Sequence, residues 1–368
     1  MRPSRCDGRR KGEAGMKPEL MLEPLPPGKL PAWLLRKVLP RSPIDPNVIV
    51  GPGLGRDAAA MLVGDRVIVA KNDPITFASE HGAKHLVEIN ANDVACMGAT
   101  PRWLLVTGLL PHGVTPAGVL NQFAELREAC SRRAVDLVGG HTEIVPGLQR
   151  PILIGMMLGE TTPDDLIKPG QARPGDVLLL TKGLAIEGTA LLARERRDEL
   201  SARIGERVTQ TAEALLRQPG ISVVREAIAA RRAGGVTALH DPTEGGLATA
   251  IREIGAVSNA GAEIDAAAIP ILPETQAVAE ALGLDPLGML ASGALLIAAR
   301  AEAVAAIRRG VEAEGIPIAI VGRLTDASEV FTMHSGSTHR ELPEFAVDEV
   351  ARELGKSADT LRSQPESQ

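Results

Sequence analysis

Acidic residues beside glycines are the features of this sequence best suited to chemistry. Asp57 follows a glycine-rich run, and Asp73 ends an apolar stretch. Asp241 stands four residues before the glycine pair Gly245 and Gly246. Mg²⁺ in nucleotide sites takes carboxylates together with phosphate oxygens, and the N–H groups at helix N-termini donate to phosphate. One Asp beside Gly is more often a turn residue, so it is the recurrence of the pattern that predicts a Mg²⁺–nucleotide site.

Asn92 and Asp93 lie inside a stretch whose apolar spacing predicts a helix over residues 80–98. Short polar side chains are unfavourable within helices because they compete for backbone hydrogen bonds. Their presence here therefore favours a functional role. If Asp93 turns toward the same cleft as the other carboxylates, the like charges repel one another unless a cation lies among them.

A third candidate site follows the apolar stretch at 135–138, which predicts a strand. The sequence continues with Gly139, Gly140, His141, Thr142 and Glu143. A strand that ends at the glycine pair would present an imidazole and a carboxylate beside a ligand. The ordinary pKa of histidine is near neutrality, so His141 could act as a catalytic acid or base. The alternative is that His141 makes only a local hydrogen bond.

Several common active-site motifs are missing from the sequence. It has no G-x-x-x-x-G-K-[ST] loop, and no G-x-G-x-x-G that opens a helix after a strand. It also has no G-x-S-x-G nucleophile elbow and no H-E-x-x-H motif. Serine-hydrolase and zinc-protease functions therefore have no support.

The composition excludes further classes of protein. The 368 residues carry 40 Lys and Arg against 46 Asp and Glu, a net charge of −6, which argues against a nucleic-acid-binding protein with a basic surface. With Trp 2, Phe 4 and Tyr 0, a base-stacking surface is not expected. The three cysteines lack metal-ligand spacing, and no apolar run is long enough for a membrane helix. We expect a cytoplasmic protein with no nucleic-acid or membrane partner.

The elements that must position these residues form two α+β domains, joined by a proline- and glycine-rich linker at 168–175. In the first half, strands are expected at 58–63, 66–70, 104–110, 135–138 and 152–158, and helices at 30–39, 80–98 and 115–126. In the second half, strands are expected at 176–181, 294–299 and 316–321, and helices at 187–195, 201–230, 246–257 and 301–314. The polar residues beyond 356 are expected to form a tail.

In their order along the chain, these motifs resemble the aminoimidazole ribonucleotide (AIR) synthetase superfamily. The likeness covers residues 30–325 and is carried by GPGLGRDAAAML, KNDPITF, EINANDVACMGATPRW, GGHTE and HDPTEGGLATAIREI. The runs DPTEGGLATA and LGLDPL are most similar to the hydrogenase-maturation carbamoyl dehydratase branch. The resemblance implies an α+β, PurM-like fold with Mg-ATP bound between domains. It also implies a homodimer in which the N-terminal domains share a β-barrel.

The resemblance implies the site residues, and together with the composition of the two termini and of the linker it gives the expected domain limits. The implied segments are a disordered lead-in at 1–29, an ATP-binding domain at 30–167, a C-terminal domain at 168–330, and an extension with a polar tail at 331–368. The implied ligands of Mg²⁺ are Asp57, Asp73, Asp93, Glu143 and Asp241. The residues implied to lie near ATP or substrate are Arg56, Asn92, Gly139, Gly140, Thr142, Thr243, Gly245 and Gly246, and His141 is the catalytic candidate.

Departures from the family pattern leave the substrate open. Arg56 stands where the family has the first Asp of a GDDA motif, and no cysteine follows Cys130, whereas the carbamoyl dehydratases use a C-terminal cysteine. We expect a Mg-ATP-dependent enzyme that phosphorylates or activates an oxygen of a small molecule or a protein-bound group. The alternatives are a nucleotide-binding accessory protein without turnover and a kinase of the thiamine-phosphate type.

Overall fold

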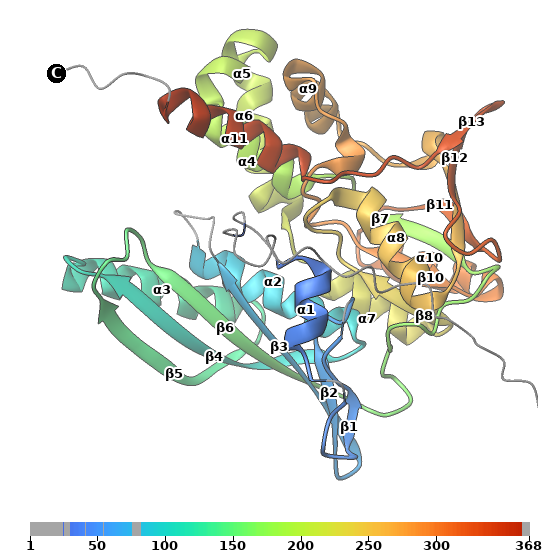
Figure 1. Ribbon diagram of the computed structural model, residues 1–368, viewed down its shortest axis with the longest axis horizontal. Helices are drawn as coiled ribbons and strands as arrows, with labels where there is room; N and C mark the ends of the chain where they lie inside the picture. Colours follow the sequence, from blue (N-terminus) through green and yellow to red (C-terminus); the bar gives the residue numbers. More distant parts are fainter. Residues whose placement is uncertain (1–24, 26–29, 41, 54, 76–81, 363–368) are drawn as a thin grey trace, which may run out of the picture. The chain divides into compact units, whose positions relative to one another are not determined.

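The computed structural model describes residues 25, 30–40, 42–53, 55–75 and 82–362. Contacts within the chain divide it into two units, residues 1–39 and 40–368. Most of the expected lead-in at 1–29 lies outside the described residues. In the first unit, Ala32–Val38 form helix α1, within the range that the sequence predicts. The second unit contains two β-sheets with their helices (Figure 1).

The first sheet has six strands in the order β1-β2-β3-β6-β4-β5. Their bounds are β1 (Val48–Val50), β2 (Ala59–Val63), β3 (Arg66–Ile75), β4 (Thr100–Pro111), β5 (Asp136–Val145) and β6 (Ile152–Thr161). β4 and β5 pair in parallel and are joined by α3 (Pro116–Arg132), whereas the other pairs are antiparallel. The Thr115 hydroxyl accepts a hydrogen bond from the N–H of Gly118 at 3.1 Å, so it caps α3 as its position before Pro116 predicts.

Helix α2 (Gly82–Cys96) connects the two sheets. Leu86, Ala91 and Val94 pack in the core of the first sheet, while Ala95 and Cys96 pack in a core formed by the second sheet and its helices. Because α2 is enclosed from both sides, all of its polar residues except Lys84 are buried. Its polar side chains therefore lie at the junction between the two sheets.

Strand β5 is longer than the sequence predicts. It does not end at the glycine pair but continues through His141 to Val145 as the edge strand of the sheet. Gly140 has φ +146° beside a register shift in β4, and a Cβ there would lie 1.9 Å from the carbonyl oxygen of Val106. Only glycine fits at this position, so Gly140 is required for the pairing of β5 with β4. The prediction that the strand ends there is wrong.

The second sheet has seven strands in the order β13-β12-β9-β11-β7-β10-β8. Their bounds are β7 (Val177–Thr181), β8 (Val236–His240), β9 (Gly261–Asp265), β10 (Leu296–Ala299), β11 (Ile318–Thr325), β12 (Phe331–Ser335) and β13 (Thr338–Glu341). β12 pairs with β9 in parallel, and the other pairs are antiparallel. In β7, Leu178 and Leu180 face one core and Leu179 faces the other, so both faces of this sheet are covered.

The helices around the second sheet agree with the expected ranges, except for the helix at 273–282, which the sequence analysis did not predict, and for the region near the C-terminus. They are α4 (Ile186–Glu195), α5 (Arg197–Ile204), α6 (Glu206–Ala214), α7 (Val224–Ala233), α8 (Gly246–Ser258), α9 (Pro273–Leu282), α10 (Val304–Ala313) and α11 (Glu349–Arg362). The helical region at 201–230 is broken by a π-helical turn, η2 (Leu216–Gly220), which contains Pro219. The expected polar tail begins inside α11, whose backbone is helical to Arg362. In the described part of the chain, no helix is both long and apolar enough to cross a membrane.

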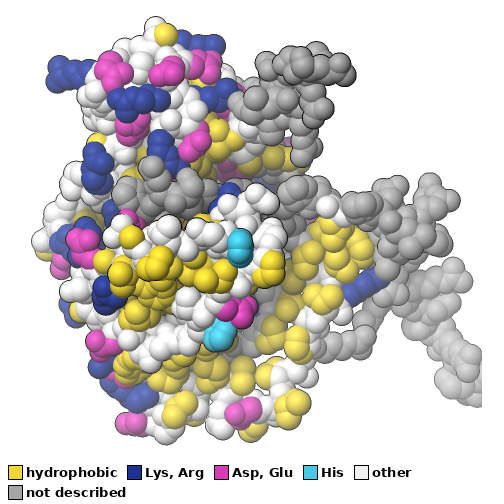
Figure 2. Space-filling model, turned by 90° about the vertical axis from the view of Figure 1, so that its left-hand side faces the viewer, with side chains coloured by type: hydrophobic (Ala, Val, Ile, Leu, Met, Phe, Trp, Pro, Cys, Tyr) yellow, Lys and Arg dark blue, Asp and Glu magenta, His cyan; other side chains and the backbone are white. Residues whose placement is uncertain are grey.

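The face of the first sheet that points away from α2 carries apolar side chains. On β6, the residues facing α2 are buried, whereas Ile154 and Leu158 on the other face are half-buried and Met156 is 39% exposed. Their neighbours on β4, Trp103 and Leu105, are also half-buried. Viewed from the side where the ends of β4, β5 and β6 lie, hydrophobic side chains gather over the surface (Figure 2).

Candidate functional site

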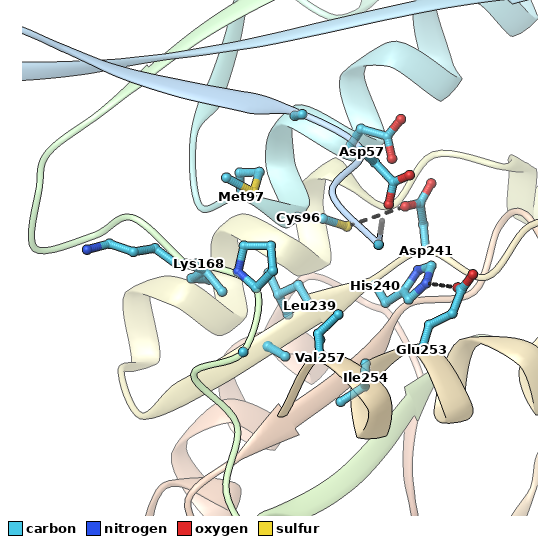
Figure 3. Close-up of a pocket in the computed structure, with 17 residues that line it drawn as sticks. Asp57, Cys96, Met97, Lys168, Leu239, His240, Asp241, Glu253, Ile254 and Val257 are labelled. Atoms are coloured by element: carbon cyan, nitrogen blue, oxygen red, sulfur yellow. Dashed lines mark hydrogen bonds and ion pairs between the residues drawn. The ribbon is translucent and has the colours of Figure 1, made fainter. Parts of the chain in front are cut away.

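Three of the predicted metal ligands line one small cavity. Asp57 reaches it from the segment before β2, Asp93 from α2, and Asp241 from the residue after β8. Asp57, Cys96 and Asp241 lie at one end of the cavity and Lys168 at the other (Figure 3). The volume is about 70 Å³, which suits an ion with a few waters or a phosphate rather than a whole nucleotide.

Asp241 is the most deeply buried of these carboxylates. It is 3% exposed, and its Oδ1 accepts a hydrogen bond from the Cys96 thiol at 3.7 Å. Its Oδ2 is buried without a hydrogen-bond partner. Burial raises the pKa of Asp241 well above its usual range, and the charge of Asp93 raises it further. This end of the cavity therefore favours a ligand that brings positive charge or a hydrogen-bond donor.

Asp93 is held by a lysine that the sequence analysis did not single out. Lys71 Nζ lies 2.8 Å from Asp93 Oδ2 and 3.5 Å from Asp73 Oδ2. Burial by itself would lower the pKa of Lys71, but the charges of Asp93, Asp73 and Asp57 raise it above its ordinary value. Lys71 is therefore a permanent cation. The predicted repulsion among the carboxylates is offset by the protein itself.

His240 provides a second fixed positive charge beside Asp241. Its Nε2 lies 2.7 Å from Glu253 Oε2 on α8. Burial would lower the pKa of His240, but the hydrogen bond and charge of Glu253, together with Asp241 and Asp57, raise it to about 9. At neutral pH this imidazole is charged, so it can attract an anion but is not free to accept a proton.

Asn92 points into the protein rather than into the cavity. Its side chain is fully buried, its Nδ2 donates to the Ile221 carbonyl, and its Oδ1 accepts from the N–H of Val223, both at 2.9 Å. These bonds tie α2 to the segment before α7. Both the carbonyl and the amino group of the Asn92 amide thus take part in fixing α2.

The residues around the glycine turn and Arg56 make hydrogen bonds within the protein. The N–H of Gly245 donates to Asp348 Oδ2 at 2.8 Å. The carbonyl of Thr243 accepts the N–H of Gly246 at 3.1 Å. The exposed Arg56 donates from Nη1 to the carbonyl of Gly51 at 3.3 Å. Arg56 is outside the set of residues that line the cavity.

The five predicted residues on β5 do not reach this cavity within one chain. Gly139, Gly140, His141, Thr142 and Glu143 are all exposed. His141 pairs with Thr107, which pairs with Ile154, so His141 lies on the sheet face opposite α2. Its Nε2 is 3.4 Å from Glu143 Oε2, which is the local contact that the alternative interpretation predicts.

Four residues at or beside the site were missed by sequence analysis: Lys71, Cys96, His240 and Glu253. Lys71 stands two residues before Asp73 in a strand, so the alternation of side chains places both on one face. His240 directly precedes Asp241. The positions of Lys71 and His240 next to predicted metal ligands could therefore have identified them from the sequence. Cys96 and Glu253 meet the others only through the packing of α2 and α8.

The carboxylates that line the cavity can supply some, but not all, of the ligands that a divalent cation needs. In the described ranges, no three His, Cys, Asp or Glu side chains are close enough together to hold a metal ion alone. Mg²⁺ binds through one or two carboxylates plus phosphate oxygens, so the pair Asp57 and Asp241, with the unpartnered Asp241 oxygen, is compatible with Mg²⁺ carried by a nucleotide. Asp73 is already paired with Lys71.

Two models of known protein domains match this chain. The model of the N-terminal domain of AIR synthase related proteins matches residues 55–161, and that of the C-terminal domain matches residues 173–334. The chain belongs to the AIR synthase related family. The cavity takes residues from both matched regions.

Individual relatives narrow the family placement. Carbamoyl dehydratase HypE of Cupriavidus necator is 32% identical over 300 residues, which cover 72% of this chain and 82% of that protein. Selenide, water dikinase of Pseudomonas straminea is 31% identical over 260 residues, 69% of each chain. The solved structure of HypE in complex with ATP has a TM-score of 0.63 at 23% identity, over 83% of this chain and 92% of that one. The predicted family, its HypE-like branch and the α+β fold are confirmed.

Proposed function

We propose that this protein is a Mg²⁺- and ATP-dependent enzyme that phosphorylates, and thereby activates, an oxygen atom of a small molecule or of a protein-bound group. The observation that carries the proposal is the cavity lined by Asp57, Asp93 and Asp241, in which one Asp241 oxygen is buried without a hydrogen-bond partner. Such an oxygen is costly unless a ligand supplies a cation or a donor. The similarity to relatives named for ATP-linked chemistry supports Mg-ATP as the ligand that brings this cation.

The acidic residues of the site are suited to binding the metal ion, and the basic residue His240 is suited to binding phosphate. When bound, Mg-ATP supplies a transferable phosphoryl group and the cation that neutralises it. Asp57 and Asp241 would hold the metal at the end of the cavity where their side chains lie together. The His240 imidazolium, fixed by Glu253, lies beside them and favours an anionic phosphate. Ile254 and Val257 of α8 add apolar side chains to the lining of the cavity.

We further propose that the enzyme acts in the cytoplasm as a homodimer. The apolar face of the first sheet, with Met156 at 39% exposure, is suited to pairing with a second copy. His141 and Glu143 lie on that same face, opposite the side that carries Asp93. A catalytic role for His141 at the cavity therefore requires a second copy to bring it there.

The test is a calorimetric titration of ATP, with and without Mg²⁺, into wild type and Asp241→Asn. The substitution keeps the size and removes the charge, so we expect Mg-ATP affinity to fall at least ~10-fold, about 1.4 kcal/mol, while the melting temperature is maintained. Asp326→Asn is the matched control, because Asp326 is exposed in the loop between β11 and β12. Equal Mg-ATP affinity in wild type and Asp241→Asn would show that Asp241 is not a ligand.

Turnover is tested separately by incubating the full chain with Mg-ATP and a metabolite collection. Mass spectrometry detects ADP and any product that has gained a phosphoryl group. A metabolite that stimulates ADP release supports the enzyme. Tight Mg-ATP binding without ADP release under any condition favours the accessory protein instead.

A further inference from the structure

Lys71 is a buried cation that the proposed chemistry leaves unassigned. It lies on the face of β3 that carries Val67 and Val69 toward α2, and only 8% of its side chain is exposed. A lysine is rarely buried in this way unless its charge is paired. Its position is therefore explained by the charges around it rather than by packing.

Two carboxylates from different elements hold the ammonium group. The 2.8 Å distance from Lys71 Nζ to Asp93 Oδ2 is that of a charge-assisted hydrogen bond, and the 3.5 Å distance to Asp73 Oδ2 is that of an ion pair. Asp93 comes from α2 and Asp73 from β3 itself. Both are residues that the family resemblance implies as metal ligands, and the ammonium lies where an ion shared by them would bind.

An ammonium and a divalent ion cannot occupy this position together. Carboxylate oxygens bind Mg²⁺ at about 2.0–2.1 Å, so an ion that bridges Asp73 and Asp93 would lie against Lys71 Nζ and be repelled by its charge. The other end of the carboxylate cluster differs, since Asp241 Oδ2 is buried and lacks a hydrogen-bond partner. One end is thus neutralised by the protein, and the other is open to a ligand.

We propose that Lys71 is the resident cation of this cluster, that Asp73 and Asp93 consequently do not share a divalent metal ion, and that metal binding is confined to the end formed by Asp57 and Asp241. The inference rests on the proposed function. It deepens that function because it specifies which carboxylates can bind the metal ion. The test uses a metal ion without nucleotide, so that a failure of this inference can be distinguished from a failure of the proposed ATP-dependent function.

The experiment is a titration of Mn²⁺ into the full chain without nucleotide, followed by calorimetry and by the electron paramagnetic resonance signal of free Mn²⁺. In Lys71→Met the two carboxylates lose their cation, and we expect one additional bound Mn²⁺ or at least ~10-fold tighter binding. Lys182→Met is the matched control, because Lys182 is equally buried but pairs with a single carboxylate, Glu226, at 2.7 Å. It should gain no Mn²⁺ site.

A second variant tests the inference without disturbing the buried pair. Asp73 is 39% exposed, so Asp73→Asn should fold normally. We expect its Mn²⁺ binding to match wild type within twofold. A tenfold loss in Asp73→Asn, or unchanged Mn²⁺ binding in folded Lys71→Met, would overturn the inference. If Lys71→Met does not fold, the Asp73→Asn titration decides. A change in ATP affinity alone bears only on the proposed function.

Discussion

The carboxylate of Asp348 accepts a hydrogen bond from the backbone N–H of Gly245 at 2.8 Å, although the two residues are 103 positions apart. The same side chain caps α11, since its Oδ1 accepts from the N–H groups of Val350 and Ala351. The segment after β13 is therefore joined to the turn that opens α8. The N–H of Gly245, which the family pattern assigns to phosphate or substrate, is already bonded within the protein.

Asp348→Ala should destabilise the protein by about 2 kcal/mol, because it removes a helix cap and leaves the buried N–H of Gly245 without an acceptor. Urea unfolding of the full chain measures the difference. Asp265→Ala is the matched control, since Asp265 caps only the short turn η3 (Ala266–Ala268) at an exposed position. Equal losses in the two variants would show that the contact with Gly245 adds nothing.

Asn92→Ala should cost about 3 kcal/mol of unfolding free energy. The substitution leaves the carbonyl of Ile221 and the N–H of Val223 buried without partners, and each such group costs about 1–3 kcal/mol. Denaturant midpoints compare it with Asn121→Ala, which removes an exposed amide from α3. If Asn92→Ala is as stable as Asn121→Ala, the two hydrogen bonds do not hold α2 in place.

Light scattering at micromolar concentration should give a mass near twice 38.6 kDa. Met156→Glu places a charge on the apolar face of the first sheet and should shift the mass to one chain, because burying that charge in an interface is costly. Ile320→Glu, at a 43% exposed position on β11 of the second sheet, should leave the mass unchanged. A wild-type mass of one chain would contradict the proposed homodimer.

Cys130 should resist alkylation in the folded protein. Burial raises its pKa to about 11, so at pH 8 the reactive thiolate is on the order of 10⁻³ of the total, against about a quarter at an ordinary pKa of 8.5. Because the folded pKa lies above the unfolded one, ionisation favours unfolding, and this group's contribution to stability falls as pH rises from about 8.5 through 11. Mass spectrometry after iodoacetamide treatment at pH 8 should find Cys130 modified in urea and largely unmodified without it. Equal rates in both states would contradict the burial.

The sequence by itself determined the local elements and the identity of the chemical groups. The spacing of Leu86, Val87 and Val94 predicts α2, and Thr115 with Pro116 predicts the start of α3, because helical periodicity and capping depend on residues close along the chain. The motifs also indicated Asp57, Asp73, Asp93, Glu143 and Asp241 as one set. Asp57, Asp93 and Asp241 line a single cavity, whereas Asp73 and Glu143 are outside its lining.

Only the tertiary structure decided which of these groups face one another. Asn92 and Asp93 are adjacent in sequence, yet one amide is consumed by backbone groups 129 and 131 residues away while the neighbouring carboxylate lines the cavity. His141 follows a glycine pair that indicates a strand end, but pairing with β4 carries the strand onward and places it on the opposite sheet face. Lys71 is one basic residue among 40 until α2 packs on β3 and brings Asp93 to its ammonium. The physical reason is that side-chain direction in a strand or helix is a local property, whereas the charges and acceptors it meets depend on packing between distant segments.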